Sequence, residues 1–180
     1  MRKVLVLLMF LGSLCLPVRA ALDVGDVAPD FTLPAALDGK LFQYTLANEL
    51  AKGPVVLYFF PAAFSEGCSR EAHLFAESIH EFKALGASVI GVSGDDPELI
   101  RRFSVQACQG KFPVAADEKK AVIKAYDTAM MTRPDYANRV SFVIAPNGKV
   151  LFVYLNLNPE QHVERTLSAV REWTKAQPKR

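Results

Sequence analysis

Apolar residues form two kinds of pattern along the first half of the chain. Unbroken runs at 55–60 and 87–92 are rich in β-branched and aromatic residues, as is typical of strands buried on both faces. Pro61 ends the first run, because a proline cannot donate a hydrogen bond to a neighbouring strand. Between 65 and 85 the apolar residues recur instead at helical spacing, up to Gly86. The pattern therefore predicts a strand, a long helix and a second strand.

The second half alternates in the same way and closes with a hairpin and a helix. Asp95 or Asp96 can cap a helix that has Pro97 in its first turn. An Asn-Gly pair, Asn147 and Gly148, separates two further β-branched runs and predicts a β-hairpin. The expected elements are a helix at 97–107, a strand at 113–115, a helix at 119–125, strands at 140–144 and 150–155, and an amphipathic helix at 159–175. This order predicts an α/β fold with a central mixed sheet flanked by helices.

The composition agrees with one folded domain. The 180 residues are 51% hydrophobic and 22% charged, which is enough for a sizeable core and excludes disordered and low-complexity classes. Three cysteines cannot staple a chain of this length as a disulfide scaffold. No internal repeat or linker divides the chain, and we expect a single domain over residues 21–180.

The first twenty residues have the three-part pattern of a secretory signal peptide. A basic start at 1–3 precedes thirteen mainly apolar residues at 4–16, and Val18 and Ala20 are small residues ahead of a cleavage site. Thirteen residues span only ~20 Å as a helix, less than a ~30 Å hydrocarbon core, so we expect no stable membrane anchor. We therefore expect residues 1–20 to be removed and the protein to be exported, as a periplasmic or secreted protein.

Loss of this segment changes the charge and the cysteine count. The full chain has a formal net charge of +2, but the segment holds three basic residues and no acidic one, which leaves eighteen basic residues against nineteen acidic. No basic stripe remains, which argues against nucleic-acid binding. Cys15 is lost as well, so Cys68 and Cys108 are the cysteines that enter an oxidising compartment.

Residues 61–68, between the first strand and the long helix, carry the candidate chemistry. They place Cys68 in the first turn of a helix, where free backbone N–H groups and the positive end of the helix dipole stabilise a thiolate. Ser65 lies one turn earlier and can direct a hydroxyl at the group that the sulfur attacks, while Gly67 lets the backbone approach closely. A free cysteine is as commonly a small core residue, so position alone leaves both interpretations open.

Pro61, Ser65 and Cys68 match the pattern Pro-x-x-x-Thr/Ser-x-x-Cys, and with it the chain resembles the peroxiredoxins of the alkyl hydroperoxide reductase and thiol-specific antioxidant type. Further segments resemble that family in the same order, over about residues 22–173. These segments are 24–33, 37–40, 91–93, 112–114 and 139–144. The branch that the chain most resembles is the bacterioferritin-comigratory or Q-type group.

The resemblance implies a thioredoxin-like fold and a thiol peroxidase that needs no metal or organic cofactor. By the motif, Cys68 is the peroxidatic cysteine, which attacks the O–O bond of hydrogen peroxide or an organic hydroperoxide and becomes a sulfenic acid. Pro61 shapes the loop and shields the sulfur from bulk water, and Ser65 hydrogen-bonds the peroxide oxygens. Arg139 stabilises the thiolate and the charge on the leaving oxygen; without the resemblance it would be interpreted as a surface salt-bridge residue.

The resemblance also makes Cys108 the candidate for an internal resolving cysteine. One subgroup carries its resolving cysteine five positions after the peroxidatic one, where this chain has His73. Cys108 falls about one turn later than the resolving cysteine of another Q-type subgroup, and a bond would require part of the Cys68 helix to unwind. A reversible Cys68–Cys108 disulfide, resolution by an external thiol and a permanent structural disulfide all stay open.

Charged residues near the motif add less to the functional interpretation. Glu66 would oppose thiolate formation if it pointed at the sulfur, so we expect it to face solvent. His73, Glu77 and His80 share a helical face, but such a set is more often solvated than ligating, and we expect no metal there.

The alternative functions share the expected fold but differ from a peroxidase in their chemistry. An exported thiol:disulfide oxidoreductase needs a second cysteine three positions after Cys68, where Glu71 stands, and copper delivery usually needs one four positions after it, where Ala72 stands. A non-catalytic thioredoxin-fold module is the third alternative. The partners that we expect are a peroxide substrate and a thioredoxin-like or small-thiol reductant, with the chain a monomer or a homodimer.

Overall fold

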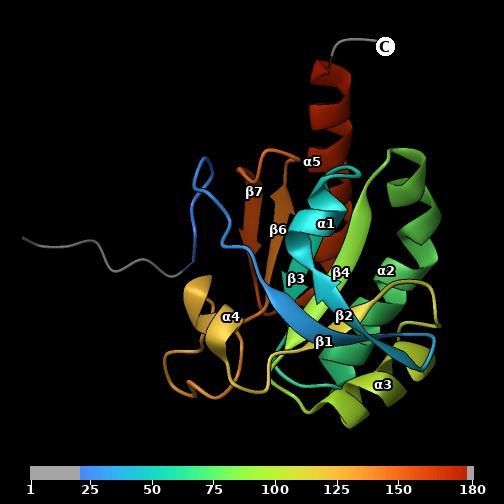
Figure 1. Ribbon diagram of the computed structural model, residues 1–180, viewed down its shortest axis with the longest axis vertical. Helices are drawn as coiled ribbons and strands as arrows, with labels where there is room; N and C mark the ends of the chain where they lie inside the picture. Colours follow the sequence, from blue (N-terminus) through green and yellow to red (C-terminus); the bar gives the residue numbers. More distant parts are fainter. Residues whose placement is uncertain (1–20, 178–180) are drawn as a thin grey trace, which may run out of the picture.

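The computed structural model describes residues 21–177, which form a seven-stranded mixed sheet with helices on both faces (Figure 1). The strands are β1 (Thr32–Leu37), β2 (Lys40–Thr45), β3 (Val55–Phe59), β4 (Ser88–Ser93), β5 (Val114–Ala116), β6 (Val140–Ile144) and β7 (Val150–Leu155). The helices are α1 (Leu46–Leu50), α2 (Glu66–Ala84), α3 (Pro97–Gln106), α4 (Ala121–Ala125) and α5 (His162–Ala176), and a 3-10 turn, η1 (Pro159–Gln161), precedes α5.

The sheet has the strand order β2-β1-β5-β4-β3-β6-β7. Strands β3, β4 and β5 run parallel to one another, and all other neighbouring strands are antiparallel. The predicted α/β fold with a central mixed sheet is therefore confirmed. Because β3 lies between β4 and β6, the segment that follows β3 starts from the middle of the sheet.

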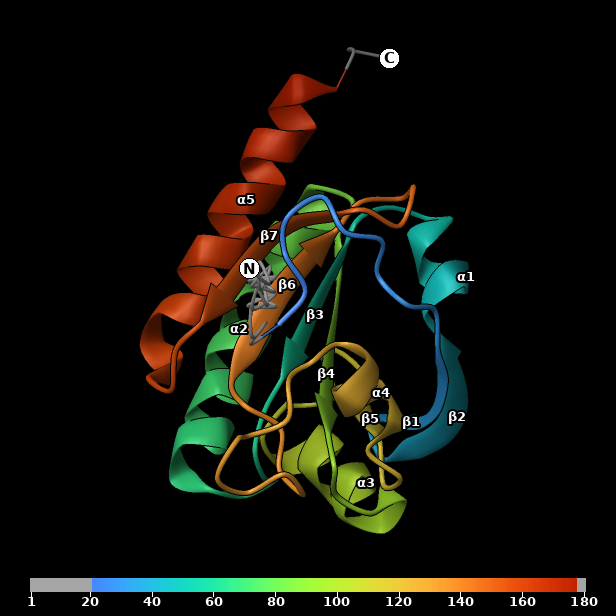
Figure 2. The ribbon, with the colours of Figure 1, turned by 90° about the vertical axis from the view of Figure 1, so that its left-hand side faces the viewer.

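Alternating residues of β3 supply two separate cores. Val56 and Tyr58 pack into the core beneath α2, α3 and α5, whereas Val55, Leu57 and Phe59 pack into the core on the side of α1 and α4. Figure 2 shows α2 and α5 together on one side of the sheet and α1 on the other. All five residues of β3 are buried, as the unbroken apolar run predicts.

A hairpin of β1 and β2 lies at the start of the chain, and its place in the sheet was not predicted. β1 pairs with β2 on one side and, through Ala35 opposite Ala115, with β5 on the other. Most of β2 is exposed, so its sequence lacks the apolar pattern of the inner strands. Helix α1 has only five residues, too few to show a helical period, and was not predicted.

The sequence left open whether Asp95 or Asp96 caps the helix after β4, and the structure gives the two aspartates different roles. Asp96 caps α3, since its Oδ1 accepts a hydrogen bond of 2.9 Å from the amide of Leu99. Asp95 instead turns to the loop after β3, where its Oδ2 accepts a hydrogen bond of 2.7 Å from the amide of Ala63. The candidate catalytic loop is thus fixed to the end of the neighbouring strand.

The predicted signal peptide, residues 1–20, lies outside the described residues and stays a prediction. Within residues 21–177, no helix is both long enough and apolar enough to cross a membrane.

Candidate active site

Cys68 lies in the first turn of α2, at the carboxyl end of β3. Ser65 is the residue before the helix, and its carbonyl accepts the first helical hydrogen bond, 2.9 Å from the amide of Ser69. The amide of Cys68 is therefore among those that have no acceptor within the helix, and they leave partial positive charge at this end. The cysteine is only 1% exposed and belongs to the core beneath α2, α3 and α5.

The loop before Cys68 is held in an unusual conformation. Phe64 has a φ of +64°, in the left-handed region that a bulky side chain rarely adopts. Its ring packs edge-on against Phe103 of α3, with 5.3 Å between the ring centroids. Asp95, which accepts 2.7 and 2.8 Å hydrogen bonds from the Ala63 amide and the Ser93 hydroxyl, secures the loop on its other side.

The structure brings Arg139 against the sulfur. Arg139 directly precedes β6, and because Val140 pairs with Phe59, it lies at the same end of the sheet as the loop that follows β3. Its Nη2 donates to Cys68 Sγ at 3.4 Å, its Nε donates to the carbonyl of Leu157 at 2.9 Å, and the side chain is almost fully buried. A guanidinium in this position stabilises negative charge on the sulfur.

Gly67 leaves space for this guanidinium. A Cβ atom at position 67 would lie 3.1 Å from Arg139 Nη2, closer than most carbon contacts. Glycine therefore makes room here for a side chain that approaches the helix from the start of another strand, and is not needed for the backbone conformation.

Glu71 is a buried member of the site that the sequence analysis did not assign. Its carboxylate oxygen Oε2 accepts a hydrogen bond from Arg139 Nη1, and the residue is fully buried. Burial raises the pKa of Glu71 to about 8, although the charge of Arg139 acts in the opposite direction. The signal in the sequence was a charged residue within the apolar face of α2, beside Cys68, Ala72 and Phe75.

His162 and Ser141 complete this buried polar group. His162 Nδ1 lies 2.7 Å from Ser141 Oγ and 3.6 Å from the second oxygen of Glu71, Oε1, while its Nε2 lies 2.9 Å from the carbonyl of Asn156. Burial lowers the pKa of His162 to about 4, so the ring is neutral near pH 7.

The other residues of the motif are more exposed to solvent than Cys68. Ser65 is exposed, and its hydroxyl donates to the carbonyl of Ala62 at 3.0 Å, while Pro61 is half-buried at the start of the loop. Glu66 is exposed, as predicted.

Cys108 follows the end of α3 and is fully buried as a free thiol. Cys68 is also free, and both side chains belong to the same core. Burial raises the pKa of Cys108 well above its usual range, so it stays a neutral thiol in this fold.

The histidines on the outer face of α2 form surface contacts. His73 lies 3.2 Å from Glu77 Oε1 through Nε2 and 2.7 Å from Gln109 Nε2 through Nδ1. His80 Nδ1 contacts the carbonyl of Glu77 at 3.1 Å. In the part of the chain that the structure describes, no three side chains of the ligating types gather closely enough to hold a metal ion.

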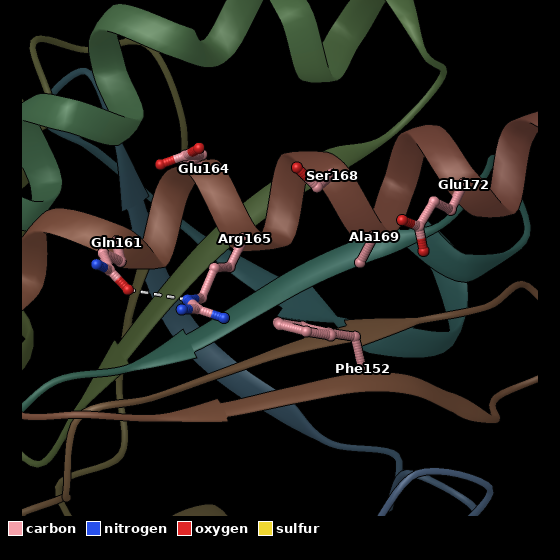
Figure 3. A pocket seen from close by; sticks show the side chains of 7 residues that line it. All are labelled: Phe152, Gln161, Glu164, Arg165, Ser168, Ala169 and Glu172. Atoms are coloured by element: carbon pink, nitrogen blue, oxygen red, sulfur yellow. Dashed lines mark hydrogen bonds between the residues drawn. The ribbon is translucent and has the colours of Figure 1, made fainter.

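Two hollows lie near these elements. One, of about 450 Å³, lies between α5 and β7, where Phe152 points toward Arg165 and Gln161 Oε1 accepts a 3.0 Å hydrogen bond from Arg165 Nε (Figure 3). It contains none of the predicted site residues. A second, of about 340 Å³, lies beside the first turns of α2 and is lined by Phe64, Ser69, Arg70, His73, Gln106 and Ala107.

Known proteins of similar sequence come from one family. The sequence profile of the AhpC/TSA family matches residues 24–153. The chain is 34% identical over 151 residues to "Peroxiredoxin Q, chloroplastic" of Gentiana triflora, covering 83% of this chain and 67% of that protein. It is 36% identical over 157 residues to the protein of the same name from Arabidopsis thaliana, covering 86% of this chain and 69% of that protein.

Solved structures show the same fold. The crystal structure of peroxidoxin BcpB from Mycobacterium tuberculosis has a TM-score of 0.75 at 29% identity, covering 83% of this chain and 96% of that one. Mycobacterium tuberculosis AhpC has a TM-score of 0.75 at 23% identity, covering 87% and 96% of the two chains.

Proposed function

The chain belongs to the AhpC/TSA family of peroxiredoxins and is a thiol peroxidase, and we propose that Cys68 is its peroxidatic cysteine, with Ser65, Pro61 and Arg139 as the supporting residues. The observation that carries the proposal is the contact of 3.4 Å between the Arg139 guanidinium and Cys68 Sγ at the start of α2. Family membership favours the peroxidase over the thiol:disulfide oxidoreductase and the non-catalytic module. The position where an oxidoreductase would carry its second cysteine is occupied by Glu71, buried against Arg139.

In the proposed reaction, the Cys68 thiolate attacks one oxygen of the peroxide. The S–O bond forms as the O–O bond breaks, and the leaving alkoxide or hydroxide takes a proton to become an alcohol or water. Cys68 is oxidised to a sulfenic acid while the peroxide is reduced. Arg139 stabilises the charge as it moves from sulfur to the leaving oxygen, and Ser65 exchanges its 3.0 Å bond to Ala62 for a bond to the peroxide.

Reduction of the sulfenic acid needs a second thiol. Cys108 shares a core with Cys68 but is fully buried, so it can attack only after the end of α3 and the first turn of α2 loosen. We propose this internal disulfide as the first route, followed by reduction by a thioredoxin-like or small thiol. Direct reduction by an external thiol is the competing route.

Rapid mixing with peroxide tests the function. At equimolar hydrogen peroxide, quenched-flow mass spectrometry should find Cys68 oxidised at least about a hundredfold faster than free cysteine, given the usual value of preorganised donors at developing charge. Cys68→Ser should abolish the reaction, and Arg139→Gln should slow it by about the same hundredfold. A rate for the unmodified chain no faster than that of free cysteine would contradict the proposal. The same measurement with alkyl and lipid hydroperoxides ranks the substrates.

We also propose that the protein acts after export. The basic start, the short apolar run and the small residues Val18 and Ala20 support this. Expressed in a bacterium with a secretion pathway, the protein should appear in the periplasm or medium with an intact mass that lacks residues 1–20. An uncleaved chain in the cytoplasm would contradict it.

A further inference from the structure

Two acidic groups in the site contact a single cation. Arg139 donates through Nη2 to Cys68 Sγ at 3.4 Å and through Nη1 to Glu71 Oε2, and all three side chains are almost completely buried. If the thiol and the carboxyl were both ionised, the group would carry a net negative charge away from water, which is costly. One proton is therefore retained by the pair, on either the sulfur or the carboxyl.

The second oxygen of Glu71 indicates where this proton lies. Oε1 is buried and has no hydrogen bond, and the atom that it faces is His162 Nδ1, 3.6 Å away. Nε2 of His162 lies 2.9 Å from the carbonyl of Asn156, which can only accept, so Nε2 carries the ring hydrogen and Nδ1 carries a lone pair. Because Nδ1 carries no hydrogen, the Ser141 hydroxyl 2.7 Å away donates to it and occupies its lone pair. An ionised Oε1 would therefore face an electron-rich nitrogen without any donor, whereas a protonated Oε1 has no charge to be repelled.

We propose that His162 is a positioning residue that keeps the shared proton on Glu71, so that Arg139 is left to stabilise the thiolate of Cys68. Ser141 contributes by fixing the ring, because its hydroxyl lies 2.7 Å from Nδ1. The inference rests on the proposed role of Cys68 and extends it, because a histidine on α5 that does not touch the sulfur then sets the thiolate fraction. The raised pKa of Glu71, about 8, agrees with a neutral carboxyl near pH 7.

The titratable groups around Glu71 are few, so the coupling can be isolated. Arg139 comes from the start of β6, Cys68 from the same helix and His162 from α5. Tyr58 of β3 is also near, but its burial raises its pKa further above the usual range, so it stays neutral. At the surface, the Arg70–Glu160 pair joins α2 to η1 through a 3.0 Å contact and is exposed to solvent.

Glu71→Gln is the first test, because the glutamine amide has the shape of a protonated carboxyl. Its oxygen can accept from Arg139, and its neutral amide nitrogen leaves the side that faces His162 uncharged. The readout is the rate of Cys68 alkylation by iodoacetamide against pH, followed by peptide-resolved mass spectrometry, which reports the thiolate without any peroxide. We expect the midpoint of this profile to stay within about half a pH unit of the unmodified chain, since one unit corresponds to a tenfold change in thiolate population. A fall of a full unit or more would show that Glu71 is ionised beside the thiolate, and would overturn the proposal.

His162→Phe is the second test, and it is combined with Glu71→Gln. Without Nδ1, the Ser141 hydroxyl turns to Glu71 as the acceptor, which favours the carboxylate and moves the proton to the sulfur. The midpoint should rise by about one unit or more, a tenfold loss of thiolate at lower pH. The double variant should return to the midpoint of Glu71→Gln, which a purely structural effect of the substitution would not produce. An equal shift in the single and double variants would contradict the proposal.

Two exposed positions on the same helix supply matched controls. Glu77→Gln removes the same charge from α2 on its outer face, and His80→Phe makes the same aromatic replacement there. Neither should move the midpoint. A chain that shows the expected alkylation pattern but no fast reaction with peroxide would refute the proposed function and leave the shared proton intact. Fast peroxide reaction with a large shift in Glu71→Gln would refute the shared proton alone.

Discussion

Each of the three nitrogens of the Arg139 guanidinium donates a hydrogen bond, and Gly67 lies close to Nη2. Its partners are the carbonyl of Leu157 at 2.9 Å, the carboxyl of Glu71 and the sulfur of Cys68 at 3.4 Å. Because each partner fixes a different nitrogen, the cation cannot follow a small displacement without losing one of them. The position of the guanidinium at the sulfur therefore depends on Gly67, a residue without a side chain.

Gly67→Ala separates activity from stability at this position. The added Cβ would lie 3.1 Å from Arg139 Nη2, so the guanidinium must shift away from the sulfur. We expect the second-order rate constant with peroxide to fall about tenfold, the effect of about 1.4 kcal/mol at the transition state. The free energy of unfolding should stay level or rise by up to about 1 kcal/mol, because alanine favours the helix.

Stopped-flow kinetics and urea unfolding measure the two effects. Ser78→Ala, on the same helix but ten positions after Cys68, is the control for helix propensity alone. Unchanged peroxide kinetics in Gly67→Ala would show that the space at Gly67 does not keep the guanidinium at the sulfur.

At the scale of elements, the start of α2 and the end of α3 must move together if the two cysteines are to meet. Arg70 and Glu160, with a 3.0 Å contact, tie the first turns of α2 to η1. His73 and Gln109, 2.7 Å apart, tie α2 to the segment that follows α3. These surface contacts are individually weak, which fits a helix end that opens during a catalytic cycle.

Cys108→Ser tests whether this opening is used. The first oxidation of Cys68 should keep its rate, because Cys108 is not one of the partners that hold the Arg139 guanidinium against the sulfur. Turnover with a dithiol reductant should fall at least about tenfold, since the buried disulfide partner is lost while the peroxide step is retained. Steady-state peroxide consumption measures this.

Ala107→Ser is the matched control, because it places a hydroxyl at the neighbouring position and leaves the sulfur in place. Full turnover in Cys108→Ser would remove Cys108 from the mechanism and favour an external thiol.

At the scale of the whole molecule, two buried titratable groups make stability depend on pH in opposite directions. The pKa of Glu71 is raised to about 8, against ~4.3 in an unfolded chain, so the folded state binds more protons between these values and loses stability as pH rises. The pKa of His162 is lowered to about 4, against ~6.5 when unfolded, so stability is lost as pH falls through this range.

Above pH 6.5 His162 no longer contributes, and comparison with Glu71→Gln isolates the contribution of Glu71. Relative to Glu71→Gln, the free energy of unfolding should fall by roughly 1–2 kcal/mol between pH 6.5 and 8, at up to ~1.4 kcal/mol per unit. Urea unfolding at several pH values should show this difference from Glu71→Gln in both the unmodified chain and Glu77→Gln. An equal slope in Glu71→Gln would assign it to another group.

Much of the molecule follows from the linear pattern. The unbroken apolar run of β3, the helical spacing of α2 and the Asn-Gly turn between β6 and β7 each depend on local preference or on burial of a whole segment, which neighbouring residues in the chain report. The motif from Pro61 to Cys68 is local as well, so its loop and its helix start could be predicted. The place of β1 and β2 in the sheet could not, because strand neighbours are chosen by contacts between distant segments.

The amino-acid sequence was enough to predict the α/β order of elements, the position of Cys68 at a helix start and, through a family resemblance, the contact of Arg139 with it. The residues that surround this pair could be identified only from the folded chain. Glu71 was predicted only as the residue that excludes a Cys-x-x-Cys motif, and His162 and Ser141 were not singled out as site residues. They meet because α2 and α5 pack on the same face of the sheet, over β6, where burial of unpaired charge forces polar side chains from separate segments to share partners.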